Sequence, residues 1–200
     1  MMVYFTAAHL FIGLSALFIA LIVLWRQQKS FSCLFFFSVF WMYMMGVISV
    51  VAFPFPVGIT NPNFKPSINL IPLNFGDCGF LILCIRNIYE NILLTIPFGF
   101  GISFIIQIKP NKIPWLAVAV GLVFERSQLI ISLIVHSPFR VVDINDVILN
   151  AIGVLLGYGV FKIFGWFYLN ITHRFNIQHK YIFAYIHNIA QNHNHHSQMH

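Results

Sequence analysis

Long apolar stretches alternate with short polar segments along most of this chain. A helix needs about 20 residues to cross a bilayer core of about 30 Å. Five stretches are long enough, and we expect spans near residues 3–25, 31–53, 88–108, 113–135 and 147–169. The first is longer than the apolar region of a normal signal peptide and no basic residue precedes it, so we expect an uncleaved helix. The pattern predicts an all-α, polytopic membrane protein with about five transmembrane helices.

Composition agrees with that pattern. Of the 200 residues, 59% are hydrophobic and only 8% are charged, whereas soluble domains have about 25% charged residues. A net charge of +6 could suggest nucleic-acid binding, but the basic residues are scattered near the ends of the predicted spans. Such residues are better explained as topological anchors. We therefore expect membrane lipids, and no nucleic acid, among the partners.

The basic residues also predict an orientation in the cell membrane. Residues 26–29 and 109–112 are short turns with two positive charges each. If the N-terminus lies outside, these turns and the C-terminal tail place six basic residues in the cytoplasm, and the outer segments carry three. Cytoplasmic loops carry an excess of Lys and Arg. We expect a multi-pass protein with its N-terminus outside and its C-terminus in the cytoplasm.

The longest loop, residues 54–87, contains five prolines and several turn signals. It either lies on the outer headgroups or forms a lid over the polar residues described below. Its apolar end, residues 79–85, is too short to span and predicts an interfacial or re-entrant piece. Cys78 and Cys84 could form a disulfide if this loop is extracytoplasmic.

Seven of the nine histidines lie after residue 170. Within this tail, residues 181–190 predict an interfacial helix. The last ten residues resemble a metal-binding tract, although a polar terminus with adventitious metal affinity is the simpler interpretation.

Four of the five acidic residues lie in or beside the apolar stretches, namely Glu90, Glu125, Asp143 and Asp146. A carboxylate at the bilayer centre costs about 2.5–3.5 kcal/mol on insertion scales. On a helix, Asp143, Asp146 and Asn150 fall within about 60° of one another. The same stripe continues through two glycines, residues 153 and 157, which would let a neighbouring helix approach closely.

Glu125 and Gln128 share one face of the fourth predicted span, because they are three residues apart. We expect these side chains to meet Asn91 and the acidic stripe at one level of the membrane. The simpler alternative is that these groups only neutralise one another, since buried charges are normally paired. The candidate catalytic residues are Glu125, Asp146 and Asp143, and the candidate substrate-binding residues are Arg140, Gln128, Asn150, Asn91 and Arg126. No metal ligand set, cofactor or reaction follows from them.

Four sequence features together resemble the VanZ-like membrane protein family. They are NLIP at 69–72, NILLTIPFGF at 91–100, Glu125-x-x-Gln128, and the series Arg140-x-x-Asp143-x-x-Asp146-x-x-x-Asn150-x-x-Gly153-x-x-x-Gly157. The resemblance covers residues 69–158 in the expected order. It implies an α-helical membrane protein of the bacterial cell envelope, associated with resistance to glycopeptide antibiotics and above all to teicoplanin. It also implies a division into two N-terminal helices (1–54), a VanZ-like domain (55–170) and a His-rich tail (171–200).

Three functions remain open. The first is an envelope factor that lowers the surface exposure of a glycopeptide target, with a lipid-linked envelope component or the glycopeptide as partner. The second is an intramembrane enzyme acting on a lipid-linked phosphate or sugar, with Glu125 and Asp146 as acid, base or metal ligands and Arg140 on the anion. The third is a small transporter, for which five spans without an internal repeat give the least support.

Overall fold

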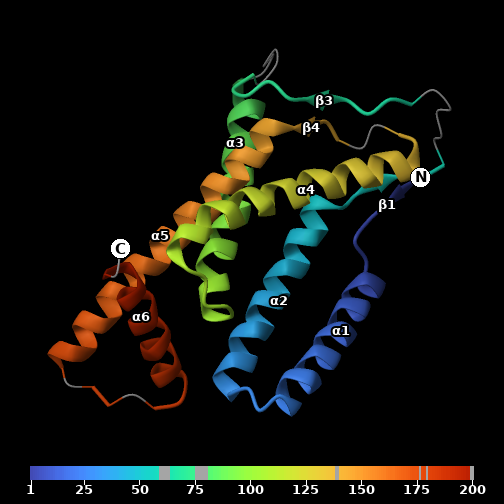
Figure 1. Cartoon of the computed structure of the whole chain (residues 1–200). Coiled ribbons are helices and arrows are strands. Elements are labelled where there is room, and N and C mark those ends of the chain that lie inside the picture. The colour runs from blue at the N-terminus through green and yellow to red at the C-terminus, as the bar shows by residue number, and fades with distance from the viewer. Residues whose placement is uncertain (59–63, 75–80, 138–139, 176, 179, 199–200) are drawn as a thin grey trace.

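The computed structural model describes residues 1–58, 64–74, 81–137, 140–175, 177–178 and 180–198. Most of these residues are helical, which confirms the predicted all-α class (Figure 1). The helices are α1 (Ala7–Arg26), α2 (Phe31–Val51), α3 (Leu81–Gly101), α4 (Ile113–Val135), α5 (Ile144–Arg174) and α6 (Ile182–Gln198). Two short 3-10 helices, Ile102–Phe104 and Pro110–Lys112, lie between α3 and α4.

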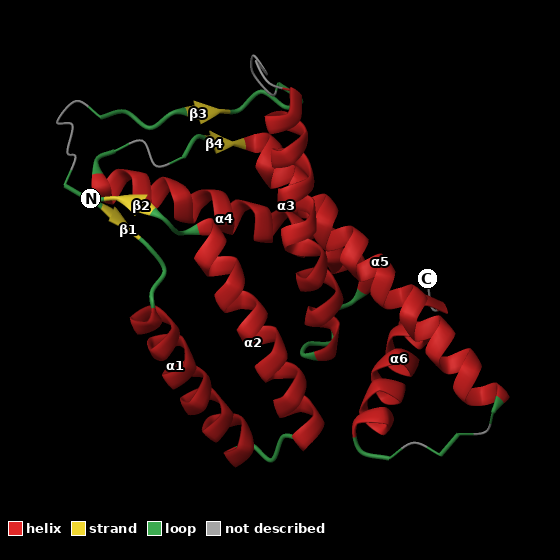
Figure 2. Ribbon diagram, turned by 180° about the vertical axis from the view of Figure 1, so that it is seen from behind, coloured by secondary structure: helices red, strands yellow, loops and turns green. Residues whose placement is uncertain are grey.

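Four very short strands tie the connecting segments together (Figure 2). β1 (Met2–Val3) pairs antiparallel with β2 (Phe55–Pro56), which joins the N-terminus to the segment after α2. β3 (Ile68–Asn69) pairs parallel with β4 (Val142–Asp143), which joins the long loop to the start of α5. Both pairs lie at the end of the molecule opposite the turn between α1 and α2 (Figure 1).

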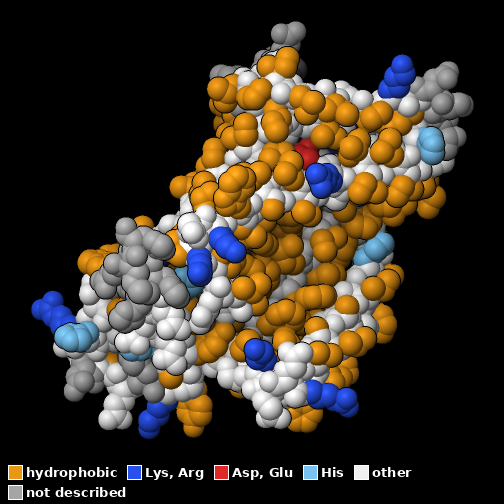
Figure 3. Space-filling view, in the orientation of Figure 1, with side chains coloured by type: hydrophobic (Ala, Val, Ile, Leu, Met, Phe, Trp, Pro, Cys, Tyr) orange, Lys and Arg blue, Asp and Glu red, His pale blue; other side chains and the backbone are white. Residues whose placement is uncertain are grey.

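Four helices within the described ranges are long and apolar enough to cross a membrane: α1, α2, α5 and the segment Pro110–Val135 that includes α4. Many of their large apolar side chains are exposed, as is expected of surfaces that face lipid rather than water. Hydrophobic side chains cover most of the face in Figure 3, and most of the Lys and Arg side chains seen there lie in its lower half.

The third of the five predicted spans, residues 88–108, is not among these four. α3 begins at Leu81 and ends at Gly101, so it lies earlier in the chain than residues 88–108. The apolar residues 81–85 are therefore the first turns of α3, and the prediction of a separate interfacial piece is wrong for them. The predicted span began after the polar residues near 86–87, which were assigned to the loop. The structure includes them in α3, where Asn87 and Asn91 bond to Asp146 of α5. The predicted Cys78–Cys84 disulfide falls outside the described residues and side chains.

α5 is the central helix and packs most extensively against α3 and then against α4. Its two glycines make the first contact close. A Cβ atom at Gly157 would collide with the carbonyl oxygen of Ile96, and one at Gly153 would collide with the carbonyl oxygen of Ile92 and with Thr95 Oγ1. The prediction that this stripe admits a neighbouring helix is confirmed.

Helix α6 confirms the helix predicted at 181–190, and it packs against the C-terminal half of α5. Phe161 and Ile189 are buried there together with Phe104 from the first 3-10 helix. The last ten residues lie mostly beyond the side chains that the structure describes, so the metal-binding tract stays a prediction.

Candidate functional site

The first turn of α5 is held by a set of hydrogen bonds that begins at its N-cap. Asp143 Oδ1 accepts a hydrogen bond from the backbone N–H of Asn145 at 2.8 Å. An Asp at this position satisfies one of the donors that a helix N-terminus leaves free, and its charge suits the helix dipole. The cap fixes where α5 begins, and the position of that start sets the direction in which the side chains of Asp146 and Asn150 point.

Asp146 joins α5 to α3. Its Oδ1 accepts hydrogen bonds from Asn87 Nδ2 at 3.0 Å and from Asn91 Nδ2 at 2.9 Å. One turn further along α5, Asn150 Nδ2 donates to the carbonyl oxygen of Asp146 at 2.8 Å and, more weakly, to Asn91 Oδ1 at 3.4 Å. The fully buried Thr95 donates to the carbonyl oxygen of Asn150 at 2.8 Å. These bonds form a polar ladder between α3 and α5, which we define as Asn87, Asn91, Thr95, Asp146 and Asn150.

Glu125 joins α4 to the start of α5. Its side chain is only 3% exposed, and its Oε2 accepts a hydrogen bond from the backbone N–H of Asp143 at 2.9 Å. The carboxylates of Glu125, Asp143 and Asp146 and the guanidinium of Arg140 are close enough to interact electrostatically. The predicted catalytic carboxylates therefore lie in one neighbourhood, where each accepts a hydrogen bond from a protein N–H group.

Part of the long loop lies directly on this neighbourhood. Asn69 Nδ2 donates to Asp143 Oδ1 at 3.1 Å, next to the parallel pairing of β3 with β4. Asn145, which is 2% exposed, accepts from the backbone N–H of Leu73 at 2.6 Å and donates to the carbonyl oxygen of Asn74 at 2.8 Å. Residues 68–74 thus contact the start of α5, and the lid interpretation of the loop stays a prediction.

Beside the ladder lies a small polar cavity of about 90 Å³. Its apolar wall comes from the end of α2, from Leu94 and from Phe124. Its polar lining consists of Asn87, Glu90, Asn91, Gln128, Arg140 and Asn150. Four of the eight predicted site residues therefore share one cavity, although they come from α3, α4, α5 and the segment before α5.

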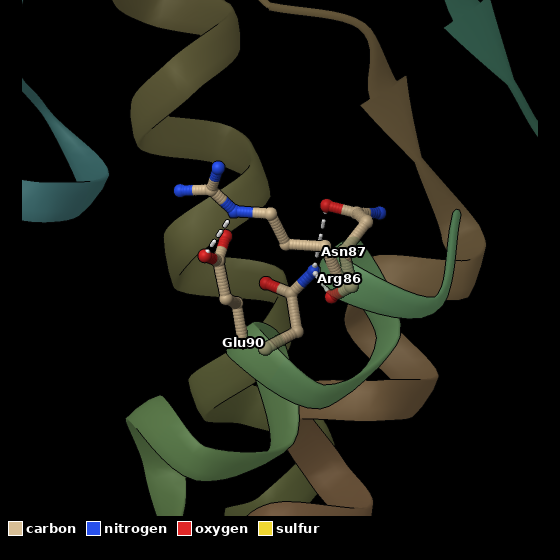
Figure 4. Close-up of polar contacts among 4 residues, drawn as sticks. Arg86, Asn87 and Glu90 are labelled. Atoms are coloured by element: carbon tan, nitrogen blue, oxygen red, sulfur yellow. Dashed lines mark hydrogen bonds and ion pairs between the residues drawn. The ribbon is translucent and has the colours of Figure 1, made fainter. Parts of the chain in front are cut away.

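Two charged side chains at the cavity are held in place. Arg140 donates from one terminal nitrogen to the carbonyl oxygen of Val50 at 2.8 Å, which ties the segment before α5 to the end of α2. Glu90 forms an ion pair with Arg86, one turn away on α3, with an Nε–Oε1 distance of 2.6 Å (Figure 4). More than half of each side chain in that pair is exposed. The cavity therefore has a charged, open side and a buried amide side.

The amide side leaves hydrogen-bonding groups unused. Asn150 is 2% exposed, and its Oδ1 has no hydrogen-bond partner among the described residues. Exchanging its oxygen and nitrogen would face an oxygen towards the Asp146 carbonyl, so the bonds made by Nδ2 fix the assignment. Gln128, 6% exposed, also lines the cavity. Buried polar atoms are normally paired, so Asn150 Oδ1 is an exception that contacts among the described residues do not explain.

The structure separates the other predicted residues from the cavity. Glu125, Asp143 and Arg126 line a different and mostly apolar pocket of about 110 Å³, bounded by Leu70 and Val147 among others. The Arg126 side chain is exposed, so it does not join the buried amides as the sequence analysis expected. One helical position separates Glu125 from Arg126, so their side chains leave α4 about 100° apart. Both line this pocket, but only Glu125 is buried.

Three residues of this region were not among the candidate site residues chosen from the sequence. Asn145 and Thr95 are almost completely buried and hold the loop and α3 against α5. Asn87 is the second amide bound to Asp146. Its spacing of four residues from Asn91 was the available signal, because such residues share a helix face. Within the described residues, no three His, Cys, Asp or Glu side chains converge as a metal site would require.

Comparison with known families adds one finding. The model of the VanZ/LLP1 family matches residues 40–165. This chain belongs to the VanZ/LLP1 family. The matched region runs from the middle of α2 into the second half of α5, so it contains the ladder, the polar cavity and Glu125. No curated protein and no solved structure matches the chain.

Family membership confirms the resemblance found in the sequence and agrees with a membrane protein whose helices are apolar. α1 and α6 lie outside the region that the VanZ/LLP1 model matches. The boundaries proposed from the sequence, at 54 and 170, stay predictions.

Proposed function

We propose that this VanZ/LLP1 protein acts in the bacterial cell envelope and lowers susceptibility to teicoplanin-type glycopeptides by altering the surface exposure of their target. The observation that carries the proposal is the polar cavity within apolar helices of the family region. Polar residues within membrane segments are expensive and usually mark a function. A protein that needed polar residues only to join helices would have no reason to gather Asn91, Gln128, Arg140 and Asn150 around a cavity.

The proposed site acts by binding, with the cavity as the binding element. Arg140 supplies positive charge on the open side, while Gln128 and Asn150 supply amide donors and acceptors on the buried side. The headgroup of a lipid-linked envelope component would complement both, with a negative charge for Arg140 and with hydrogen-bonding groups for the two amides. In the orientation predicted from the basic residues, the cavity lies towards the outer face. The loop 68–74 and the basic α1–α2 turn lie at opposite ends of the molecule, which is consistent with that orientation (Figure 1).

The test compares teicoplanin susceptibility and the binding of labelled glycopeptide to the cell surface in a sensitive Gram-positive host. The strains carry empty vector, wild type, Gln128→Leu, or Ser49→Ala as a control. Gln128→Leu removes an amide at the cavity with little change of volume, whereas Ser49 is half-buried, lies outside the cavity lining and bonds within its own helix. Membrane abundance is matched by immunoblot.

Protection by wild type and Ser49→Ala, with loss of protection in Gln128→Leu, is the expected result. Equal protection by all three proteins would show that the cavity is not the acting site. An absence of protection in every strain, despite matched abundance, would contradict the resistance role for this chain.

A second candidate is an intramembrane enzyme that acts on a lipid-linked phosphate or sugar. It is favoured by three carboxylates and Arg140 within electrostatic reach of one another. Glu125 or Asp146 would then transfer a proton, and Arg140 would hold the anion. Purified protein is incubated with envelope lipids, with and without divalent cations, and released phosphate and sugar are measured. Turnover that Glu125→Gln abolishes would support the enzyme, and no turnover by wild type would rule against it.

A further inference from the structure

A second polar hollow lies at the other end of the family region, between α6 and the segment after α3. Two adjoining pockets of about 220 and 120 Å³ share Gln107 and Asn192 in their lining. Together we call them the α6 groove. Its polar lining consists of Ser103, Gln107, Lys109, Asn188, Asn192 and His193.

The α6 groove has a fixed wall, because α6 is docked and is not a loose tail. Tyr185 donates its hydroxyl to the carbonyl oxygen of Phe104 at 2.6 Å. The Tyr185 ring stacks on Phe36 of α2 with the ring centroids 5.6 Å apart. Further along α6, Lys162 Nζ of α5 donates to the carbonyl oxygen of His193 at 3.1 Å. Three different elements therefore hold α6 in register.

One face of α6 is buried against the rest of the protein, and an adjacent, exposed face lines the groove. Ile189, Ala190 and His193 are buried. Asn188 and Asn192 are exposed, and as residues four apart they lie on the same side of the helix. Across the groove, Gln107 and Lys109 are also exposed. Amide groups and one ammonium group thus face each other across a hollow that is open to solvent or lipid headgroups.

The charge of this region has one sign. The sequence has no Asp or Glu between residues 91 and 124 and none after residue 146. The same stretches carry Lys109, Lys112, Lys162, Arg174 and Lys180. A groove with amide N–H donors, a lysine and no neighbouring carboxylate favours an anion, and lysine binds phosphate as a point charge.

The lining also indicates a lipid. Phe104, Ile105, Ile106 and Ile189 form the apolar part of the larger pocket beside its amides. Trp115, in the first turn of α4, is 78% exposed, and tryptophans are enriched at the membrane–water interface. We propose that the α6 groove binds the phosphate group of an anionic membrane lipid, with its glycerol and first acyl carbons against the apolar part. Only the α6 side of this groove lies outside the family region, and the proposal does not rest on the proposed resistance role.

The test uses the full chain purified in neutral detergent. Retained lipid is measured by native mass spectrometry, and thermal unfolding is followed during titration. The probes are phosphatidylglycerol, phosphatidylcholine as a lipid without net charge, and inorganic phosphate. The variants are Lys109→Gln, Asn192→Ala and, as a charge-matched control in the α1–α2 turn, Lys29→Gln. All three replaced side chains are exposed, so the variants are expected to fold.

Wild type and Lys29→Gln are expected to bind phosphatidylglycerol equally and more tightly than phosphatidylcholine. Lys109→Gln should lower the affinity about fivefold, the effect of one lysine near an anionic surface. Asn192→Ala should also lower the affinity, although the charge is unchanged. Equal losses in Lys29→Gln and Lys109→Gln, or no loss in Asn192→Ala, would overturn the proposal in favour of general electrostatic attraction. Binding of inorganic phosphate without binding of phosphatidylglycerol would overturn the lipid as the source of the phosphate.

Discussion

Replacing Asp146 by alanine is expected to weaken the contact between α3 and α5 more than removing any other carboxylate of this region. The substitution deletes the oxygen that accepts hydrogen bonds from Asn87 and Asn91. Hydrogen bonds between helices in membrane proteins average about 0.6 kcal/mol and reach about 1.7 kcal/mol. Two such bonds give an expected loss of about 1–3 kcal/mol in the free energy of unfolding.

Two further variants separate the hydrogen bonds from the charge. Asp146→Asn keeps an oxygen facing α3 but removes its charge, and charge-assisted bonds are about twice as strong as neutral ones. It should therefore lose about half as much free energy as Asp146→Ala. Glu90→Gln removes a carboxylate whose ion pair with Arg86 is more than half exposed. Exposed ion pairs contribute about 0–1 kcal/mol, so this variant serves as the control.

The assay is reversible unfolding in mixed micelles, with increasing fractions of dodecyl sulfate and far-UV circular dichroism as the readout. A double-mutant cycle combines Asp146→Ala with Asn91→Ala. If the ladder is correct, the double variant loses less free energy of unfolding than the sum of the two single losses, because each substitution removes the same bond between Asn91 and Asp146. Strict additivity, or a loss in Asp146→Ala no larger than that in Glu90→Gln, would refute the assignment of Asp146 as the link between α3 and α5.

Three other substitutions test separate contacts by the same unfolding assay. Gly157→Leu should cost at least about 1–3 kcal/mol by overpacking against α3, while Gly159→Leu should cost little because a Cβ there meets nothing within 4 Å; equal losses would contradict the close approach. Glu125→Ala should lose about 1–3 kcal/mol by leaving a backbone N–H at the start of α5 unpaired, and Glu125→Gln should lose clearly less, since its carbonyl oxygen can still accept that bond. Tyr185→Phe should lose about 1 kcal/mol through the missing bond to Phe104 and should speed proteolysis between α5 and α6; unchanged cleavage would mean that this bond does not hold α6.

The sequence alone predicted the helical class and the polar stripe of α5 because both depend on periodicity along one helix. Asp146, Asn150 and Gly157 were placed on one face, and that face does contact α3. Periodicity could not identify the partner atoms, since Asn87 and Thr95 belong to a helix that is distant in sequence.

The errors and omissions have similar causes. Arg126 was grouped with the site because it is charged and central in its span, but its side chain is exposed. Whether Arg126 is buried depends on which face of α4 packs against the other helices, and the sequence offered no independent signal for the packed face. Asn145 was missed because its importance comes from the backbone groups of Leu73 and Asn74. Contacts between a loop and the start of a helix leave no repeating pattern of residues in the sequence, so periodicity does not reveal them.

The order of the helices along the chain has a consequence for biosynthesis. α3 carries the amides of Asn87 and Asn91, but their acceptor, Asp146, lies beyond the whole of α4. During synthesis, α3 therefore leaves the ribosome well before the residue that satisfies it, and the loop 68–74 waits longer still for Asn145. Until α5 is delivered, Asn87 and Asn91 lack the acceptor that joins α3 to α5. Chains that terminate before α5 would expose their unpaired amides to membrane quality control.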